Sequence, residues 1–304
     1  MNLISICIPV LNEEENIFNT FNTIDKYFKH ELKEYSYEII FTDNNSSDKT
    51  EVIITDIAKN NQNIKYIRFN KNIGYDLSIL EGYRNSAGDA AVVIDCDLQD
   101  PIDIIKKFIA EWNNGHDVVY GVRKKRKENF LFNFVRKIYY KIMNASSQNN
   151  YPEGAGGFRL IDKTIIDQIS TNDNIYPYVR GLTFSLAVKP KGVDYDRTNR
   201  KLGTSKLGYY NTFTYGINAL IEQTRIFVRF FARIGVILFV SSVFFSLLNF
   251  YADFKFFTLF QNLILLLLML IVLMSIIISE YVMRIYLQIK KENKIIYEKK
   301  INLK

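Results

Sequence analysis

Short apolar runs and amphipathic stretches alternate along the first half of the chain. The apolar runs are rich in β-branched and aromatic residues, as buried strands are; they are Leu3–Val10, Tyr37–Thr42, Ile64–Phe69, Ala90–Asp95 and Asp117–Gly121. Between them, apolar positions recur at helical spacing over Glu14–Phe28, Lys49–Asn60, Leu77–Ser86 and Ile102–Trp112. This alternation predicts an α/β domain whose mainly parallel sheet is covered by helices on both faces.

The pattern changes after Arg233, where two long uncharged stretches follow each other. Ile234–Ala252 and Phe256–Ile278 are each long enough to cross a hydrocarbon core of about 30 Å as a helix. Two buried helices of a soluble core are the alternative, but such helices usually carry a polar face. We therefore predict a transmembrane hairpin over residues 234–279.

Basic residues predict the orientation of this hairpin. The connector between its two stretches carries only Asp253 and Lys255, whereas residues 280–304 form a lysine-rich tail. Because positive flanks stay in the cytoplasm, both the N-terminal domain and this basic tail are expected there, in a multi-pass protein of the plasma membrane. The first apolar stretch is short and runs into acidic residues, so no signal peptide is predicted.

Residues 209–233 connect the α/β domain, residues 1–208, to the hairpin. They mix aromatic side chains with Glu222, Arg225 and Arg229. Such a mixture is typical of an amphipathic helix that lies at a membrane surface. This helix would hold a ligand site of the domain at the height of the lipid headgroups.

The net charge of +7 suits two classes of partner. Nucleic acid is one, and the anionic inner leaflet or a phosphorylated lipid is the other. With membrane helices predicted and no nucleic-acid-binding motif in the sequence, the membrane is favoured. The two cysteines, Cys7 and Cys96, fall in predicted buried strands, where they are ordinary packing residues and fit a reducing compartment.

Polar residues gather where three of the predicted strands end. "NEEEN" follows the first strand, "DNNSSDKT" the second and "DCDLQDP" the fourth. Taken singly, these are a helix N-terminus, a loop with Asp48 as an N-cap, and a strand end before a proline-initiated helix. In a parallel sheet, however, ligands bind beyond the carboxyl ends of the strands. Three such clusters at one edge therefore favour a ligand site.

Crowded carboxylates indicate the chemistry of this site, because Asp95, Asp97 and Asp100 repel one another unless a cation lies among them. The sequence has no glycine-rich dinucleotide or P-loop motif, and two histidines are too few for a histidine-rich metal site. Hard oxygen ligands suit Mg²⁺ or Mn²⁺, bound partly through substrate phosphates. Carboxylates near the first two strands can accept hydrogen bonds from a base and a ribose. These features together predict a site for a nucleotide sugar.

The order and spacing of these motifs resemble glycosyltransferase family 2, which has the GT-A fold. The resemblance rests on "IPVLNEEENI", "TDNNSSDKT", "NKNIGYD" and "AGDAAVVIDCDLQDP". "DLQDP" narrows it to the branch that loads sugars onto polyprenyl phosphates, which includes dolichol-phosphate mannose synthases and bacterial polyprenyl-phosphate glucosyltransferases. The later segments "YGVRKKR", "GGFRLIDK" and "RTNRKLGTSK" agree with that branch, as do the two predicted membrane helices.

The resemblance implies roles for individual residues. Asp97 would be the direct metal ligand and Asp95 would face the ribose and diphosphate. Gln99 and Asp100, at the start of a helix, would lie on the sugar or acceptor side, and with Asp97 and Arg200 they form the implied catalytic set. The implied nucleoside pocket consists of Pro9, Asn12, Glu13 and Asp43. The acceptor phosphate would be held by Arg123, Arg126, Arg197, Arg200, Ser205 and Lys206, although the basic run Arg123–Lys127 also fits a solvated loop.

Two positions depart from the family pattern. The loop after the second strand often reads Asp-Asp-Gly-Ser in the family, whereas Asp43 is followed here by Asn44 and Asn45. Many bacterial relatives also carry an aspartate, proposed as the catalytic base, where this chain has Gly157. The mannose-synthase branch tends to have glycine there. A hydroxyl acceptor would need such a base, but a phosphate monoester, with a second pKa of about 6, is already largely dianionic.

We therefore predict a metal-dependent, inverting transferase that moves one sugar from a nucleotide sugar to a polyprenyl phosphate, such as undecaprenyl phosphate, on the cytoplasmic face. UDP-glucose is the first donor hypothesis, and UDP-galactose, UDP-GlcNAc and GDP-mannose remain open. One alternative is a transferase acting on a saccharide hydroxyl, with Glu153 as its base. Another is an inactive membrane scaffold, which the glycine at position 157 motivates. Membrane relatives often associate, so a homo-oligomer is a further expectation.

Overall fold

The structure is a computed structural model, and it divides into two compact units. One comprises Met1–Glu222 with Lys294–Lys304, and the other comprises Gln223–Asn293. The residues it describes are 1–123, 137–144, 151–152, 154–171, 177–198, 216, 233–241, 244, 257–290 and 295–303.

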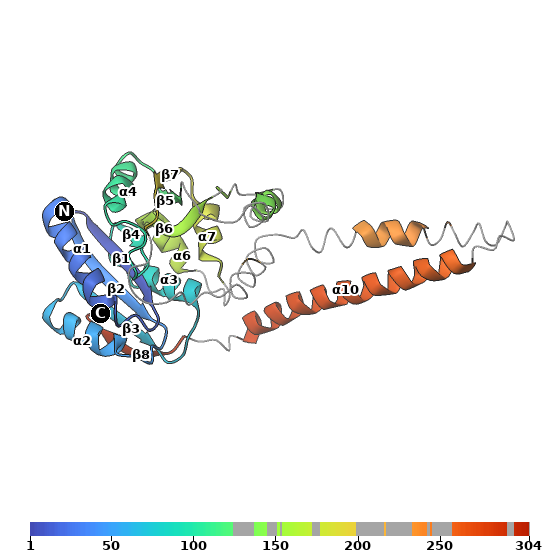
Figure 1. Cartoon of the computed structure of the whole chain (residues 1–304), viewed down its shortest axis with the longest axis horizontal. Coiled ribbons are helices and arrows are strands. Elements are labelled where there is room, and N and C mark those ends of the chain that lie inside the picture. The colour runs from blue at the N-terminus through green and yellow to red at the C-terminus, as the bar shows by residue number, and fades with distance from the viewer. Residues whose placement is uncertain are drawn as a thin grey trace. The chain divides into compact units, whose positions relative to one another are not determined.

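The first unit is built on an eight-stranded sheet with the strand order β7-β5-β6-β4-β1-β2-β3-β8 (Figure 1). The neighbouring pairs among β1, β2, β3 and β4 are parallel, as is the pair β5 and β7, whereas β6 and β8 run antiparallel to their neighbours. The mainly parallel α/β sheet predicted from the sequence is therefore confirmed. The strands are β1 (Leu3–Val10), β2 (Ser36–Asp43), β3 (Ile64–Phe69), β4 (Ala90–Val93), β5 (Val118–Arg123), β6 (Ala155–Asp162), β7 (Pro190–Tyr195) and β8 (Tyr297–Ile301).

Helices bury both faces of this sheet, which explains why its central strands are apolar runs without a polar side. Ile4, Ile6 and Ile8 of β1 pack in one core, while Cys7 packs in the other, because successive side chains point to opposite faces. The first core receives α1 (Ile17–Glu31), α2 (Thr50–Asn60) and α4 (Ile104–Asn113). The second receives α3 (Tyr75–Arg84), α6 (Lys163–Ser170) and α7 (Val179–Leu186).

The fourth strand is shorter than the sequence predicted. β4 ends at Val93, two residues before Asp95. Cys96 is buried at 3% exposure, but it lies beyond the strand and not within it. The early end leaves residues 94–100 to form the irregular turn that carries three aspartates.

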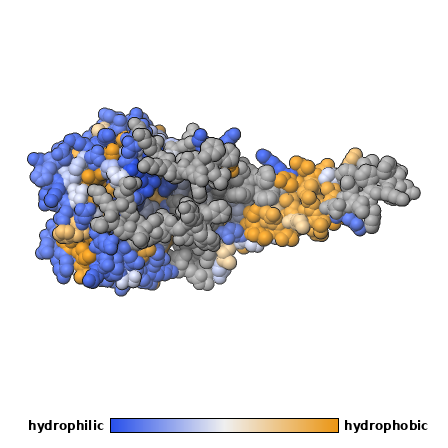
Figure 2. Space-filling view, in the orientation of Figure 1, coloured by the Kyte–Doolittle hydropathy of each residue, from blue (hydrophilic) through white to orange (hydrophobic). Residues whose placement is uncertain are grey.

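The second unit contains α10 (Phe257–Lys290). Within it, Leu263–Met283 is long and apolar enough to cross a membrane, and it is the one such helix in the part of the chain that the structure describes. None of its most apolar window is buried among the described residues, whereas the core helix of a soluble protein is mostly buried. Figure 2 shows its side chains as an apolar surface.

The predicted first crossing is described only in part. Residues 233–241 and 244 are helical, and the rest of 234–252 lies outside the described residues. The two-crossing hairpin therefore stays a prediction. The predicted interfacial helix, residues 209–233, also lies outside them except for 216 and 233.

The predicted basic tail, residues 280–304, is not a separate region. Its first part continues α10 to Lys290, and β8, at its end, pairs with β3 in the first unit. The alternation of β8 is obscured by charge, because its sequence is "YEKKI". Strand pairing with β3, and not local hydrophobicity, gives this segment its structure.

Candidate functional site

The predicted site residues lie at the carboxyl edge of three adjacent strands. β1 has β2 on one side and β4 on the other. Val10 at the end of β1 lies opposite Asp43 at the end of β2, and Cys7 lies opposite Val93, after which the chain turns toward Asp95. The polar clusters that are far apart in sequence therefore share one edge of the sheet, as expected for a parallel sheet.

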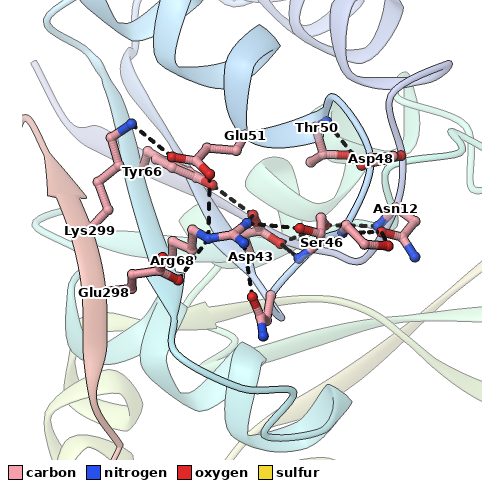
Figure 3. Close-up of polar contacts among 12 residues, drawn as sticks. Asn12, Asp43, Ser46, Asp48, Thr50, Glu51, Tyr66, Arg68, Glu298 and Lys299 are labelled. Carbon is pink, nitrogen blue, oxygen red and sulfur yellow. Dashed lines mark hydrogen bonds and ion pairs between the residues drawn. The ribbon is translucent and has the colours of Figure 1, made fainter.

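The first group at this edge, the Asp43 cluster, consists of Asn12, Asp43, Ser46, Tyr66 and Arg68 (Figure 3). The Asp43 side chain is 0% exposed. Its Oδ1 accepts from the backbone N and Oγ of Ser46, at 2.8 and 2.6 Å. Its Oδ2 accepts from Tyr66 Oη at 2.7 Å and from Arg68 Nη1 at 2.9 Å. These four bonds fill the acceptor capacity of a carboxylate, so in this structure Asp43 holds the loop after β2.

The loops after β1 and β2 are joined by further hydrogen bonds. The backbone N of Asn12 donates to Ser46 Oγ at 2.8 Å, and Asn12 Oδ1 accepts from the backbone N of Ser47 at 2.7 Å. The backbone N of Glu13 donates to Thr50 Oγ1 at 2.8 Å. Pro9 lies within β1, opposite Thr42. The predicted nucleoside residues thus belong to one connected wall of the site.

Asn45, which departs from the family pattern, has a structural part in this wall. Its φ of 63° is left-handed, a conformation in which asparagine is enriched. Its Oδ1 accepts from Arg68 Nη2 at 2.9 Å, and its Nδ2 donates to the carbonyl oxygen of Asn70 at 3.2 Å. Asn45 stands where the family pattern has glycine, and its amide makes two contacts that a glycine could not make.

The second group, the Asp100 cluster, consists of Asp95, Asp100, Arg123, Tyr195 and Arg197. Asp100 is 1% exposed, and its Oδ1 accepts from Tyr195 Oη at 2.6 Å. Arg197 Nε lies 3.2 Å from Asp100 Oδ1, and Arg123 Nη2 lies 3.7 Å from Asp100 Oδ2. Arg197 Nη2 also lies 3.5 Å from Asp95 Oδ2. Asp100 thus holds two guanidinium groups beside the more exposed carboxylate of Asp95.

Burial and charge act in opposite directions on this cluster. Burial raises the pKa of the Asp100 carboxyl above its usual range, although Arg123 and Arg197 oppose the shift. Burial lowers the pKa of the Arg123 guanidinium, but Asp100 and Tyr195 more than compensate and the pKa rises. Burial next to Asp100 also raises the pKa of Tyr195, so its hydroxyl stays protonated and donates. With its donors already in place, Asp100 is suited to anchoring the arginines and not to accepting a proton from substrate.

Asp97 sits in a tight turn between the two aspartates of this cluster. Leu98 has a φ of 48°, a conformation that costs energy for a residue other than glycine and is often kept at functional sites. Asp97 Oδ1 accepts from the backbone N of Gln99 at 3.2 Å. The carbonyl oxygen of Gln99 in turn accepts from the backbone N of Thr198 at 2.9 Å. The segment after β7 is therefore docked directly on the "DLQD" turn.

The residues at this turn fit a divalent cation that takes most of its ligands from substrate. Asp97 is partly exposed at the edge of the sheet, and its carboxylate is the hard oxygen donor that Mg²⁺ and Mn²⁺ prefer. Within the described ranges, no three His, Cys, Asp or Glu side chains converge on a point where an ion could be held by protein alone. An ion here would be held by Asp97 together with diphosphate and water oxygens.

Two tyrosines belong to the site although the sequence did not identify them. Tyr75 Oη donates to Asp95 Oδ1 at 2.8 Å, and Tyr195 joins Asp100 to Arg123, whose Nε donates to it at 3.0 Å. Tyr75 stands in the family motif "NKNIGYD", which was the available signal. Tyr195 ends a strand that the local pattern did not reveal, so it carried no signal of its own.

Glycines make room for both tyrosines. A Cβ at Gly157 would lie 3.0 Å from Tyr75 Oη, and a Cβ at Gly121 would lie 2.5 Å from Tyr195 Cε1. The second distance is shorter than real Cβ contacts, so Gly121 is required where Tyr195 crosses β5. Beside Gly157, the neighbouring space holds the Tyr75 hydroxyl.

Part of the predicted site lies outside the described residues. Of the implied phosphate-binding residues, the structure describes Arg123 and Arg197 and brings both to Asp100. The alternative base Glu153 lies outside the described residues. So do the remaining phosphate-binding residues of the prediction, which are Arg126, Arg200, Ser205 and Lys206.

The chain is similar to known glycosyltransferases in sequence. The sequence profile described as glycosyl transferase family 2 matches residues 5–170. Glycosyltransferase CsbB of Bacillus subtilis (strain 168) is 30% identical over 296 residues, which are 95% of this chain and 89% of that protein. The SfII prophage-derived bactoprenol glucosyl transferase of Shigella flexneri is 29% identical over 305 residues, which cover 97% of each. The solved structure of mannosyl-3-phosphoglycerate synthase from Rubrobacter xylanophilus has a TM-score of 0.49 at 11% identity, over 77% of this chain and 75% of that one.

Proposed function

Because this chain belongs to glycosyl transferase family 2, we propose that it transfers a single sugar from a nucleotide sugar to a polyprenyl phosphate, with inversion at the anomeric carbon. The observation that carries the proposal is the Asp100 cluster, in which Arg123 and Arg197 are held next to Asp95 at the carboxyl edge of the sheet. Relatives along nearly the whole chain are named bactoprenol glucosyl transferases, which supports a lipid phosphate acceptor.

The donor side of the site is the wall formed by the loops after β1 and β2. Asn12 and the loop that Asp43 holds would border the nucleoside, and Asp95 would face the ribose and diphosphate. Mg²⁺ or Mn²⁺ bound at Asp97 would neutralise the diphosphate and stabilise it as a leaving group. Glucose is our first hypothesis for the sugar, supported by the names of the relatives, and UDP-glucose is the corresponding donor.

On the acceptor side, the arginines would bring an anionic phosphate to the sugar. A phosphate oxygen attacks the anomeric carbon, the bond from that carbon to the diphosphate oxygen breaks, and the nucleoside diphosphate leaves with the bonding electrons. A dianionic phosphate has no proton to lose in this step, so positioning and charge neutralisation are the main requirements. Guanidinium groups grip phosphate through paired N–H donors. This chemistry accounts for an active site with glycine at position 157.

The test of this proposal is nucleoside diphosphate release by the purified full chain in the presence of Mg²⁺ or Mn²⁺. We expect UDP release from UDP-glucose to depend on added undecaprenyl phosphate. Release that requires a saccharide instead would support the hydroxyl-acceptor alternative, in which Glu153 acts as the base. No release from UDP-glucose, UDP-galactose, UDP-GlcNAc or GDP-mannose, with either acceptor, would support an inactive scaffold. The same set of donors identifies the sugar.

We also propose that the chain crosses the plasma membrane twice, with both ends in the cytoplasm. β8 pairs with β3, so the segments before and after the apolar region must lie on the same side of any membrane. Crossings of a membrane would therefore come in pairs. α10 would provide one, and Ile234–Ala252 would provide the other.

This topology predicts the behaviour of reporter fusions. A reporter fused after Lys304 should be active only if it functions in the cytoplasm, and so should one fused before Met1. A reporter placed in the connector at Asp253–Lys255 should be active only if it functions outside the cytoplasm. A fusion after Lys304 that is active outside the cytoplasm would refute the hairpin, and the N-terminal fusion serves as the matched reference.

A further inference from the structure

The segment after α10 is docked on the first unit by side chains as well as by strand pairing. Lys299 of β8 lies opposite Arg68 of β3. Beyond the strand, Asn302 has a φ of 56°, and its Nδ2 lies within hydrogen-bond distance of three carbonyl oxygens near the end of α2, those of Ala58, Asn61 and Ile64, at 2.9, 3.2 and 2.8 Å. The end of the chain is therefore an integral part of the sheet domain.

Charges of alternating sign run from β8 to Asp43 (Figure 3). Arg68 Nε donates to Glu298 at 2.9 Å, and Arg68 Nη1 donates to Asp43 at 2.9 Å. Lys299 Nζ donates to Glu51 at 2.9 Å, and Glu51 lies 3.5 Å from Arg68 Nε. The side chains of Asp43 and Arg68 are 0% and 11% exposed, so water screens their pairing little. Glu298, at 52%, is the exposed end of this network.

Arg68 connects this network to the loop after β2. Besides Asp43, it donates to Asn45 Oδ1 at 2.9 Å and to the carbonyl oxygen of Ser46 at 3.1 Å. A guanidinium carries its donors in one rigid plane, so a contact that orients one edge of the plane orients the others. Glu298, on the Nε edge, therefore affects how Arg68 holds Asn45, Ser46 and Asp43.

We propose that β8 is a positioning element of the donor site, and that Glu298 and Lys299 act through Arg68 to keep the loop after β2 in the shape that binds a nucleoside diphosphate. The inference rests on the proposed function, which assigns that loop to the nucleoside. It adds that β8, which follows the apolar helix α10 in the sequence, determines the affinity for the donor. Glu298 and Lys299 touch neither substrate nor reacting atoms in this proposal; they are positioning residues.

The experiment compares Glu298→Gln with Tyr297→Phe in the full chain. Tyr297 is on the same strand and its hydroxyl donates to Glu81, away from Arg68, so Tyr297→Phe weakens the docking of β8 without touching the network. For Glu298→Gln we expect the Kd for UDP, and the KM for the donor, to rise about threefold to fivefold, the upper part of the range for an exposed ion pair. The kcat and the KM for undecaprenyl phosphate should not change. Tyr297→Phe should lower the melting temperature at least as much and leave the Kd for UDP unchanged.

A second variant tests the route through Arg68. Lysine at this position keeps a positive charge near Asp43 but cannot hold Asp43, Asn45 and Glu298 in one plane. We expect Arg68→Lys to raise the Kd for UDP and to remove any further effect of Glu298→Gln in the double variant.

The outcomes separate this inference from the proposed function. A wild-type chain that binds neither UDP nor GDP would overturn both. Wild-type binding with an unchanged Kd in Glu298→Gln would overturn the inference alone. Equal losses of affinity in Glu298→Gln and Tyr297→Phe would also overturn it, since β8 would then act only through stability. Additive effects of Arg68→Lys and Glu298→Gln would rule out the route through Arg68.

Discussion

Replacing Asp97 with asparagine is expected to abolish sugar transfer while the protein still folds and inserts into the membrane. Asp97 is the residue proposed as a direct metal ligand, and a neutral amide is a much weaker ligand for a hard cation than a carboxylate. The charge stabilisation lost amounts to several kcal/mol, and each 1.4 kcal/mol is about a tenfold change in rate. We expect turnover to fall by about 10³-fold or more, and the Mg²⁺ or Mn²⁺ dependence of UDP binding to disappear.

The fold should survive this change because the hydrogen bond that joins the Asp97 side chain to the backbone of the turn is retained. Its Oδ1 accepts from the backbone N of Gln99, and an asparagine Oδ1 can accept in the same way. Asp103→Asn is the matched control, since Asp103 is an exposed aspartate just before α4 that has no part in the site. Full activity in Asp97→Asn, or metal-dependent UDP binding equal to that of the wild type, would contradict the metal assignment.

The second large effect is expected at Arg197, and it tests the phosphate-nucleophile mechanism. Arg197 lies within ion-pair distance of both Asp95 and Asp100, so its removal takes positive charge from the place where an anionic acceptor would enter. Charge-assisted contacts to phosphate are the strong ones. We expect Arg197→Met to lower kcat/KM for undecaprenyl phosphate by about 10²-fold, in the range found when a stabilising donor is removed from an active site. Lys191→Met on β7 removes the same charge from an exposed position and should have no effect.

Gly157→Asp, which restores the acid of the family pattern, should not raise the turnover with undecaprenyl phosphate. The new Cβ would lie 3.0 Å from Tyr75 Oη, so Tyr75 would have to move, and its bond to Asp95 with it. The added carboxylate would also repel an incoming phosphate. In the wild type the rate should follow the second ionisation of the lipid phosphate, rising to a plateau as the pH passes about 6 to 7.

The hydroxyl-acceptor alternative predicts the reverse order of effects. Glu153→Gln would then be nearly inactive, and Arg197→Met and Arg200→Ala would retain activity with a saccharide acceptor. Turnover of Glu153→Gln, Gly157→Asp, Arg197→Met and Arg200→Ala with undecaprenyl phosphate, over pH 5 to 9, distinguishes the two mechanisms. A large gain in Gly157→Asp, or an inactive Glu153→Gln beside an unaffected Arg197→Met, would contradict the phosphate nucleophile.

Much of the sheet domain could be predicted from local pattern. The runs of β1 and β3 were predicted with their observed bounds, Leu3–Val10 and Ile64–Phe69, because strands buried on both faces are continuous apolar runs between polar ends. The same rule placed Asp43 and Asp95 at one edge, since the carboxyl ends of parallel strands coincide. The long apolar helix could also be predicted locally, because an uncharged apolar run of about 20 residues is typical of a helix that spans a membrane.

The rest depended on contacts between distant segments. β6, β7 and β8 were not predicted, and "YEKKI" of β8 and "PKGVDY" of β7 show why. Edge strands need bury only part of their side chains, so their composition is close to that of a loop, and pairing with a neighbour decides their conformation. β8 pairs with β3 across more than 200 positions of sequence.

These late strands complete the site that the early strands begin. The sequence by itself determined the α/β class, the carboxylates at the strand ends and the apolar helix, because each follows from local periodicity or from strand direction. Only the tertiary structure decided that Tyr195 and Arg197 meet Asp100, that Tyr75 lies beside Gly157, and that Arg68 joins Asp43 to Glu298. Each of these contacts joins residues from separate strands or loops, and long-range packing and charge pairing, which leave no periodic trace in the chain, bring them together.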